Sequence, residues 1–184
     1  MCSEIAVGDV IRGRFVLEKE LGSGGMGTVF KALDRLRQEA RDREPYVAVK
    51  VLSETFRRQP LSFIALQREA KKAQKLNHPN IVRVYDFDRD GSTIFLLMEY
   101  LSGKSLDAII RSIGSSDPAG LPLRRVLSVI EGVAAALSRL ARSAGCGSAG
   151  SPNKGLVVGR SGRLKNGPDR VKTLVFMGAA PIKK

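Results

Sequence analysis

Several residue types that whole classes of protein depend on are scarce in this chain. Its 184 residues include no tryptophan, one histidine and two cysteines, and aromatic residues make up 5%. Cys2 and Cys146 are too few and too far apart in the sequence to indicate a disulfide framework or a cysteine-bound metal. We therefore expect neither, and we expect a reducing, cytoplasmic environment.

Long apolar runs are absent as well. No stretch approaches the roughly 18 consecutive apolar residues of a membrane-spanning helix, so we expect no membrane span. Residues 1–4 are not followed by the basic and then apolar pattern of a secretion signal. The hydrophobic fraction of 43% still allows a buried core, and the length suits one domain of moderate size.

Acidic residues are scarce in one part of the chain. The net charge is +13, of which residues 1–120 carry +3 and residues 121–184 carry +10. Such a basic region can bind nucleic acid, anionic lipid or acidic protein, and it can equally be a solvated tail. Because Phe176 is its one aromatic residue, we do not expect a surface that stacks on nucleic-acid bases.

A glycine-rich stretch organises the first half of the chain. Gly22, Gly24 and Gly27 form the pattern G-x-G-x-x-G, which residues 15–17 precede and residues 28–31 follow with strand-like sequence. The glycines therefore join two strands, whereas in a dinucleotide-binding unit the third glycine opens a helix. Glycine allows a backbone to approach a phosphate closely. An ordinary hairpin also uses glycine, so the glycines alone leave both interpretations open.

A third strand follows at residues 47–51. With the side-chain period of two, Val47, Val49 and Val51 share one face, and Ala48 and Lys50 share the other. A small residue beside a lysine leaves room for a flat base and supplies one positive charge for phosphates. This pattern favours a nucleotide site over a plain hairpin.

These motifs resemble the protein kinase family, and specifically the bacterial serine/threonine kinases of eukaryotic type. The family pattern G-x-G-x-x-G-x-V matches residues 22–29, and V-A-x-K matches residues 47–50. The resemblance implies an α+β fold, with a first lobe of five antiparallel strands and one major helix, followed by a partial helical second lobe. It also implies that ATP is bound.

A helix predicted over residues 59–76 carries one carboxylate on an otherwise apolar face. Leu66, Glu69, Ala73 and Leu76 fall at spacings of 3, 4 and 3. A buried carboxylate without a partner is costly, so Glu69 is either exposed at the rim of that face or paired. The resemblance implies that Glu69 pairs with Lys50 and that these two form the catalytic pair present in the chain.

The next motifs follow in the family's order. Residues 76–82 match its turn into a strand, and we interpret His78 as a structural hydrogen bonder there rather than as a general base. Residues 89–92 predict a hairpin turn and residues 93–98 an apolar, central strand. Residues 98–103 resemble the kinase hinge, which binds the base edge. The residues that the resemblance implies for ATP binding are Leu21, Gly22, Ser23, Gly24, Gly25, Met26, Gly27, Thr28, Val29, Ala48, Lys50, Met98, Glu99 and Leu101.

We predict four segments. Residues 1–13 form a leader, 14–101 the first lobe, 102–143 the start of the second lobe with two helices, and 144–184 a degenerate basic tail. Within the first lobe, residues 33–45 are expected to form an exposed hairpin extension without chemistry. Ser105 is expected to cap a short helix that runs to Arg111. The long helix places its apolar residues on one face: Val126, Ile130, Val133, Leu137 and Leu140.

The resemblance fails where the family places its catalytic loop and its D-F-G motif. Gly150 stands at the position of the general base, Gly155 at that of the asparagine, and Val175 at that of the metal-binding aspartate. After Glu131 the one remaining carboxylate is Asp169. The family expects Mg²⁺, but its ligands are missing, so we assign no metal-binding residue and expect phosphoryl transfer to be absent or weak.

Three alternatives remain at this stage. The chain could be a working serine/threonine kinase rescued by Asp169, a non-enzymatic interaction module, or a truncated relic whose tail reflects an altered reading frame. The sequence shows no helices beyond residue 140 that would cover the apolar face of residues 126–140, so a protein partner, self-association or poor stability is expected there.

Overall fold

The computed structural model describes residues 5–54, 60–113, 121–143, 157–164 and 171–176. The chain divides into two compact units. The first comprises residues 1–74 and 84–100, and the second comprises residues 75–83 and 101–184. The segment 75–83, which the sequence placed within a continuous first lobe, therefore groups with the second unit.

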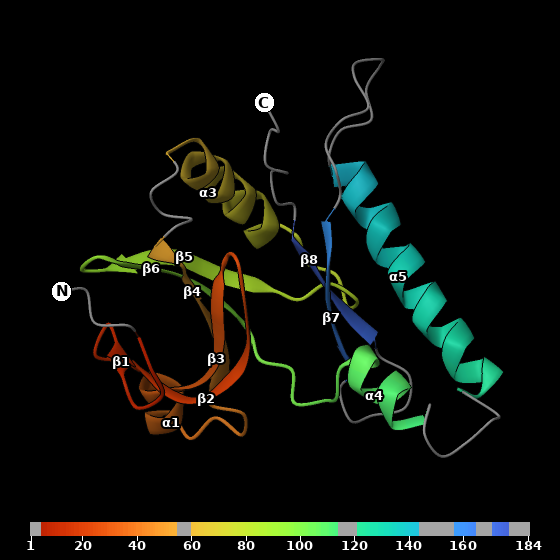
Figure 1. Cartoon of the computed structure of the whole chain (residues 1–184), viewed down its shortest axis with the longest axis horizontal. Coiled ribbons are helices and arrows are strands. Elements are labelled where there is room, and N and C mark those ends of the chain that lie inside the picture. Colours follow the sequence, from red (N-terminus) through yellow and green to blue (C-terminus); the bar gives the residue numbers. More distant parts are fainter. Residues whose placement is uncertain (1–4, 55–59, 114–120, 144–156, 165–170, 177–184) are drawn as a thin grey trace. The chain divides into compact units, whose positions relative to one another are not determined.

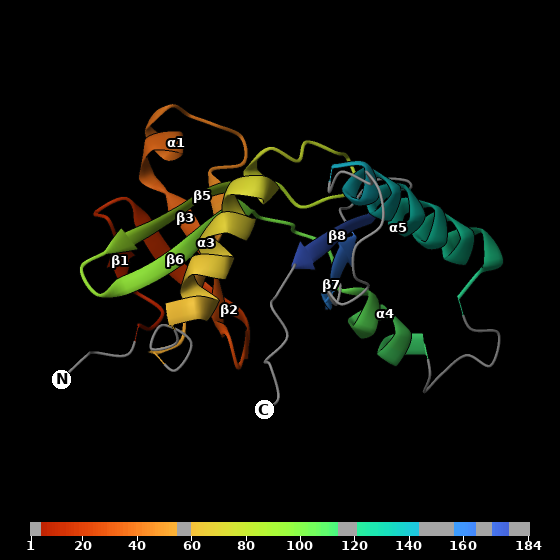
Figure 2. The ribbon, with the colours of Figure 1, turned by 90° about the horizontal axis from the view of Figure 1, so that it is seen from above.

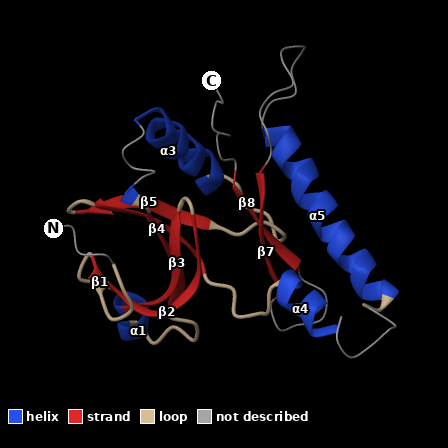
Figure 3. Cartoon of the chain, viewed as in Figure 1, coloured by secondary structure: helices blue, strands red, loops and turns tan. Residues whose placement is uncertain are grey.

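The first unit contains a six-stranded antiparallel sheet with the strand order β1-β2-β3-β4-β6-β5 (Figures 1 and 3). The strands are β1 (Val10–Ile11), β2 (Phe15–Gly24), β3 (Gly27–Asp34), β4 (Tyr46–Leu52), β5 (Val84–Asp90) and β6 (Thr93–Glu99). The five expected strands are present. The sixth, β1, lies within the expected leader and pairs with the start of β2.

One face of the sheet carries the hydrophobic core. Phe30 on β3 lies opposite Val49 on β4, which lies opposite Leu97 on β6, so all three point to the same face. Phe15 and Phe95 meet edge to face there, with ring centroids 6.4 Å apart. The buried members of this core are Ile11, Phe15, Leu17, Phe30, Ala32, Val47, Val49, Phe95 and Leu97. The prediction that the apolar strand is central is confirmed, because β6 lies between β4 and β5.

The two edges of the sheet are joined by Arg12, in the turn after β1. Its main-chain N–H donates to the carboxylate of Asp90, and its guanidinium Nη2 lies 2.8 Å from Oδ2 of Asp88. Both aspartates lie on β5, the opposite edge strand. Arg12 adopts a left-handed backbone with φ of 55°, which is uncommon for residues other than glycine. The sheet is therefore curled far enough for its outer strands to be bridged.

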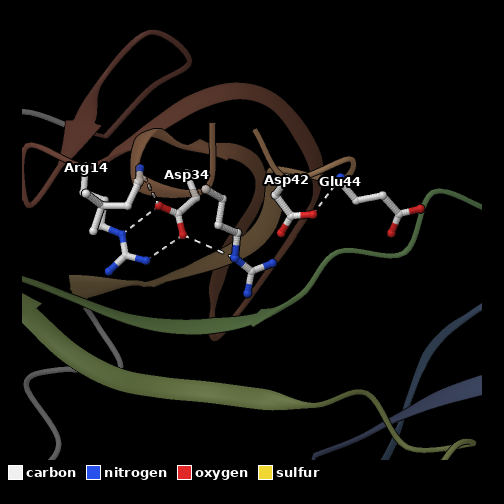
Figure 4. A network of polar contacts seen from close by, with 6 residues as sticks. Arg14, Asp34, Asp42 and Glu44 are labelled. Carbon is white, nitrogen blue, oxygen red and sulfur yellow. Dashed lines mark hydrogen bonds and ion pairs between the residues drawn. The ribbon is translucent and has the colours of Figure 1, made fainter. Parts of the chain in front are cut away.

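The segment between β3 and β4 is not the expected hairpin extension but contains a short helix, α1 (Arg35–Glu39). Asp34 caps it, because its Oδ1 accepts a hydrogen bond from the N–H of Leu36 at 3.2 Å. The Asp34 carboxylate is 1% exposed and accepts two 2.7 Å bonds from Arg14, while Nε of Arg37 lies 3.5 Å away (Figure 4). The sequence suggested exposed charges, but this carboxylate is buried and paired.

Helix α3 (Pro60–Gln74) lies against β5 (Figure 2). Leu66 and Ala70 are buried. Nε2 of Gln74 donates to the carbonyl oxygen of Tyr85 and to Oδ1 of Asp86, both at 3.3 Å. The expected helix is thus present and is attached to an edge strand at its C-terminal end.

The second unit contains α4 (Leu106–Ile113), α5 (Leu123–Ser143) and an antiparallel pair, β7 (Val157–Leu164) and β8 (Val171–Phe176). Ser105 caps α4 as predicted, because its Oγ accepts from the N–H of Ala108 at 3.1 Å. Ala136 and Leu140 of α5 are buried with Ile81.

The apolar face of α5 was expected to have little to pack against, and this is wrong for its C-terminal half. Leu140 is 8% exposed and packs in the cluster around Ile81, whereas Ile130 on the same face is 57% exposed. The packing was missed because segment 75–83, which is distant in sequence, provides it. Within the described ranges, no helix is both long and apolar enough to cross a membrane.

Candidate functional site

The face of the sheet opposite the core carries most of the residues that the sequence assigned to a nucleotide site. Val29, Lys50 and Leu96 lie directly across from one another on β3, β4 and β6. One row along, Ala48 lies opposite Met98. Because opposed residues share a face and alternate residues return to it, the structure brings Val29, Ala48, Lys50 and Met98 together on one surface. We call this surface the lysine face.

The glycine turn connects β2 and β3 at the end of the sheet nearest Lys50. Gly27 has a φ of 133°, and a Cβ atom there would collide with the carbonyl oxygen of Val51. The fold itself therefore requires glycine at this position. The turn is anchored to the residue after β4, since Ser53 donates from Oγ to the carbonyl of Gly25 and from its N–H to the carbonyl of Met26.

The other glycines of the motif are different. A Cβ atom on Gly22, Gly24 or Gly25 would meet no atom within 4 Å, and none of the three has a positive φ. Neither the backbone conformation nor the neighbouring atoms require glycine there. Open space at these glycines is compatible with a ligand that approaches the backbone closely, such as a phosphate chain. The glycine turn thus fits the triphosphate that the sequence analysis expects.

Lys50 and Glu69 both belong to the first unit, on β4 and α3. Partial burial lowers the pKa of Lys50 below its ordinary value, because the surrounding protein displaces water from the ammonium group. Atom Oε2 of Glu69 is buried. The Lys50–Glu69 ion pair stays a prediction, and the burial of both groups favours it, since buried charges require compensation.

The remaining expected contacts are distributed over both units. Met98 is 2% exposed near the end of β6. The next residue, Glu99, is the last of β6 to pair with β4, and it lies opposite Val47. Leu101 is buried in the second unit. Leu21, Ser23, Met26 and Thr28 belong to the glycine turn and its two strands, and Ser23 lies opposite Thr28.

His78 is structural as predicted, because its Nδ1 accepts from the N–H of Asn80 at 3.1 Å.

The catalytic positions of the second unit are mostly not described. Gly150, Gly155 and Asp169 lie outside the described residues. Val175 lies on β8, opposite Val158. Among the residues that the structure describes, no three His, Cys, Asp or Glu side chains gather as a metal site requires.

Sequence reasoning missed a cluster at the far end of the lysine face. Nζ of Lys31 lies 2.7 Å from Oε2 of Glu18, 3.5 Å from the ring centroid of Tyr46 and 5.8 Å from that of Tyr100. We call these four residues the Lys31 cluster. They come from β2, β3, β4 and the residue after β6, so no spacing along the chain could indicate the contact. The one available signal was that Lys31 follows Val29 by two residues on the same strand face.

The fold has close counterparts among solved structures. The kinase domain of PknI from Mycobacterium tuberculosis superimposes with a TM-score of 0.69 at 24% identity, over 97% of this chain and 64% of that domain. This likeness shows a protein kinase fold, with the glycine turn and the lysine strand in its antiparallel sheet.

The family model of the protein kinase domain matches residues 15–141, so the chain belongs to the protein kinase family. Among curated relatives, Pkn3 of Myxococcus xanthus is 36% identical over 177 residues, which are 96% of this chain and 29% of Pkn3. PknA of Mycobacterium tuberculosis is 34% identical over 145 residues, or 76% of this chain and 31% of PknA. The relatives are bacterial serine/threonine kinases of eukaryotic type, and the chain spans less than a third of the length of either one.

Proposed function

We propose that this chain binds ATP on the lysine face and that its own phosphoryl transfer is weak or absent. The observation that carries the proposal is the contrast within the glycine motif. Gly27 is required by the fold, whereas Gly22, Gly24 and Gly25 are not and face open space, at the end of the sheet nearest the half-buried Lys50. A nucleotide with its phosphates under the turn gives those three glycines a purpose.

Each group then has a defined task. Main-chain N–H groups of the glycine turn donate to the phosphates, and the ammonium of Lys50 neutralises part of their charge, with Glu69 orienting it. Val29 and Ala48 enclose the base, Met98 lies behind it, and backbone groups of Glu99 and Leu101 bind its edge. Mg²⁺ accompanies ATP in this family, but the sequence has Val175 where the metal-binding aspartate is expected and Gly150 where the general base is expected.

The first test is the thermal melt of the whole chain with and without Mg-ATP. A ligand at 100 times its Kd stabilises the folded state by about 2.7 kcal/mol. We expect such a shift in the wild-type chain and in Lys19→Ala, which removes an exposed lysine from β2. We expect no shift in Lys50→Ala. A cooperative melt that ATP leaves unchanged would overturn nucleotide binding and favour an interaction module.

A second test addresses phosphoryl transfer. The chain is incubated with γ-labelled ATP and a general protein substrate, and label in protein and in free phosphate is counted. We expect turnover close to that of the Lys50→Ala variant. Clear turnover that is lost in Asp169→Ala would instead establish a working kinase, in which the one remaining carboxylate of that region replaces the usual pair.

A further inference from the structure

The Lys31 cluster lies next to the residues proposed to enclose the base. Lys31 is directly opposite Ala48, which is opposite Met98, so the three form one row across β3, β4 and β6. Tyr46 precedes Ala48 by two residues and Tyr100 follows Met98 by two. Tyr46 therefore belongs to the next row of the lysine face, and the Tyr100 ring packs against it. The cluster borders the base end of the proposed site, and the glycine turn borders the phosphate end.

The cluster is held together by charge and by aromatic faces. The side chain of Lys31 is 20% exposed, and its ammonium contacts the Tyr46 ring and the Glu18 carboxylate. Burial lowers the pKa of Lys31, but the hydrogen bond from Lys31 to Glu18 and the charges of Glu18, Tyr46 and Tyr100 raise it by more. The net shift of the pKa is therefore upward. Lys31 is therefore a fixed cation at neutral pH.

Tyr100 is the member of the cluster that matters for the nucleotide. The ladder between β4 and β6 ends at the pair of Val47 and Glu99, so Tyr100 is the first residue beyond it. Its ring packs edge to face on Tyr46, with centroids 6.1 Å apart and planes at 65°. The ammonium of Lys31 lies over both rings. These contacts hold Tyr100 against Tyr46 and Lys31 at the end of β6.

We propose that Lys31 is a positioning residue for the base end of the site, acting through Tyr46 and Tyr100 on the backbone around Glu99. The inference rests on the proposed function, because it concerns the same nucleotide. Lys31 does not touch the phosphates in this arrangement, since Lys50 and the glycine turn lie at the other end of the lysine face. Loss of Lys31 therefore weakens recognition of the base and leaves recognition of the phosphates unchanged.

The test separates the two ends of the nucleotide with partial ligands. Binding to the whole chain is measured by displacement of a fluorescent ATP analogue with ATP, adenosine and inorganic tripolyphosphate. For Lys31→Met we expect the affinities for ATP and for adenosine to fall by the same factor, about fivefold. A loss of this size is in line with a cation–π contact and an ion pair of ordinary strength. Tripolyphosphate is expected to bind as in the wild type.

Two matched variants complete the design. Lys71→Met removes the same charge from an exposed position on α3 and should bind all three ligands like the wild type. Lys31→Arg keeps a cation that stacks on tyrosine and should restore most of the ATP affinity. The chain has three tyrosines and no tryptophan, so tyrosine emission reports largely on this cluster and should change in Lys31→Met but not in Lys71→Met.

The outcomes are distinct. Unchanged ATP affinity in Lys31→Met would overturn the inference while the Lys50-dependent melt shift still supported nucleotide binding. An equal loss for adenosine and tripolyphosphate would also overturn it, because it would show a general loss of structure. If the wild-type chain does not bind the fluorescent analogue at all, the proposed function fails, and the inference fails with it.

Discussion

The two ends of the β2–β3 hairpin are built in opposite ways. At one end, Asp34 is buried and fully engaged, by two bonds from Arg14, by the charge of Arg37 and by the N–H of Leu36. At the other end, a Cβ atom on Gly22, Gly24 or Gly25 would meet open space. The polar groups of the first end hold the fold together, whereas the second end leaves room for a ligand beside three of its glycines. The buried charge with several partners has a structural role here, and the glycines without a steric reason are the ones that we propose for the nucleotide site.

The largest expected effect is at the closed end of the hairpin. Asp34→Ala removes the partner of Arg14 and the cap of α1, and we expect it to cost about 3 kcal/mol of stability, because a buried ion pair is broken. Arg14 is 40% exposed, so water recovers part of the loss. Chemical denaturation of the whole chain measures the change. Asp42→Ala is the matched control, since Asp42 is exposed and accepts one bond from the N–H of Glu44, and it should cost about 0.5 kcal/mol or less (Figure 4). Equal losses would contradict the contrast.

A pair of glycine variants tests the open end. Gly27→Ala forces a Cβ atom against the carbonyl of Val51 at a positive φ, and we expect a loss of about 2 kcal/mol of stability. Gly24→Ala meets open space, so its stability should change by less than about 1 kcal/mol. Gly24→Ala should nevertheless bind ATP more weakly, as titration of the analogue would show. Strong destabilisation by Gly24→Ala would mean that its glycine is structural after all.

The same contrast has a pH signature. Burial raises the pKa of Asp34, but the hydrogen bond and charge of Arg14 lower it more, and the net shift is downward from 3.8. A carboxyl group with a lowered pKa in the folded state stabilises the fold above its ordinary pKa and loses that contribution as the pH falls through the lowered value. The wild-type chain should therefore lose more stability than Asp34→Asn on acidification from pH 5 to pH 2. Denaturation midpoints across that range provide the measurement, and parallel curves would count against the assignment.

The smallest expected effect concerns the bridge between the sheet edges. The side chain of Arg12 is 50% exposed, and its ion pair with Asp88 is the kind of surface contact that contributes about 0.5 kcal/mol. Arg12→Ala should therefore cost about that amount, since its main-chain bond to Asp90 is kept. Denaturation at low and high salt checks the result, and the cost should shrink with salt. A salt-independent loss of several kcal/mol would show that the Arg12 side chain contributes more stability than an exposed ion pair does.

The sequence predicted those parts of the fold that depend on neighbours in the chain. Alternation placed Ala48 and Lys50 on the face opposite Val49, and Ser105 was recognisable as a cap because its partner, Ala108, is three residues away. The glycine motif indicated the turn, but it could not distinguish Gly27, which the fold requires, from Gly24, which it does not.

The remainder depended on contacts between distant segments. Asp34 and Arg14 are 20 residues apart, and Arg12 and Asp90 are 78 apart, so no local pattern reveals either pair. The Lys31 cluster takes its members from separate strands for the same reason. Burial of the Lys50 ammonium likewise comes from packing and not from its neighbours in sequence.

The bridge made by Arg12 has a consequence for how the protein behaves in solution. An edge strand with free N–H and C=O groups is a template on which another chain can add a strand. Here β1 covers one edge, and Asp86, Asp88 and Asp90 place negative charge along the other. Removal of residues 1–12 would uncover the start of β2 and release two of those aspartates from Arg12. A shortened chain would thus offer a bare edge for strand addition.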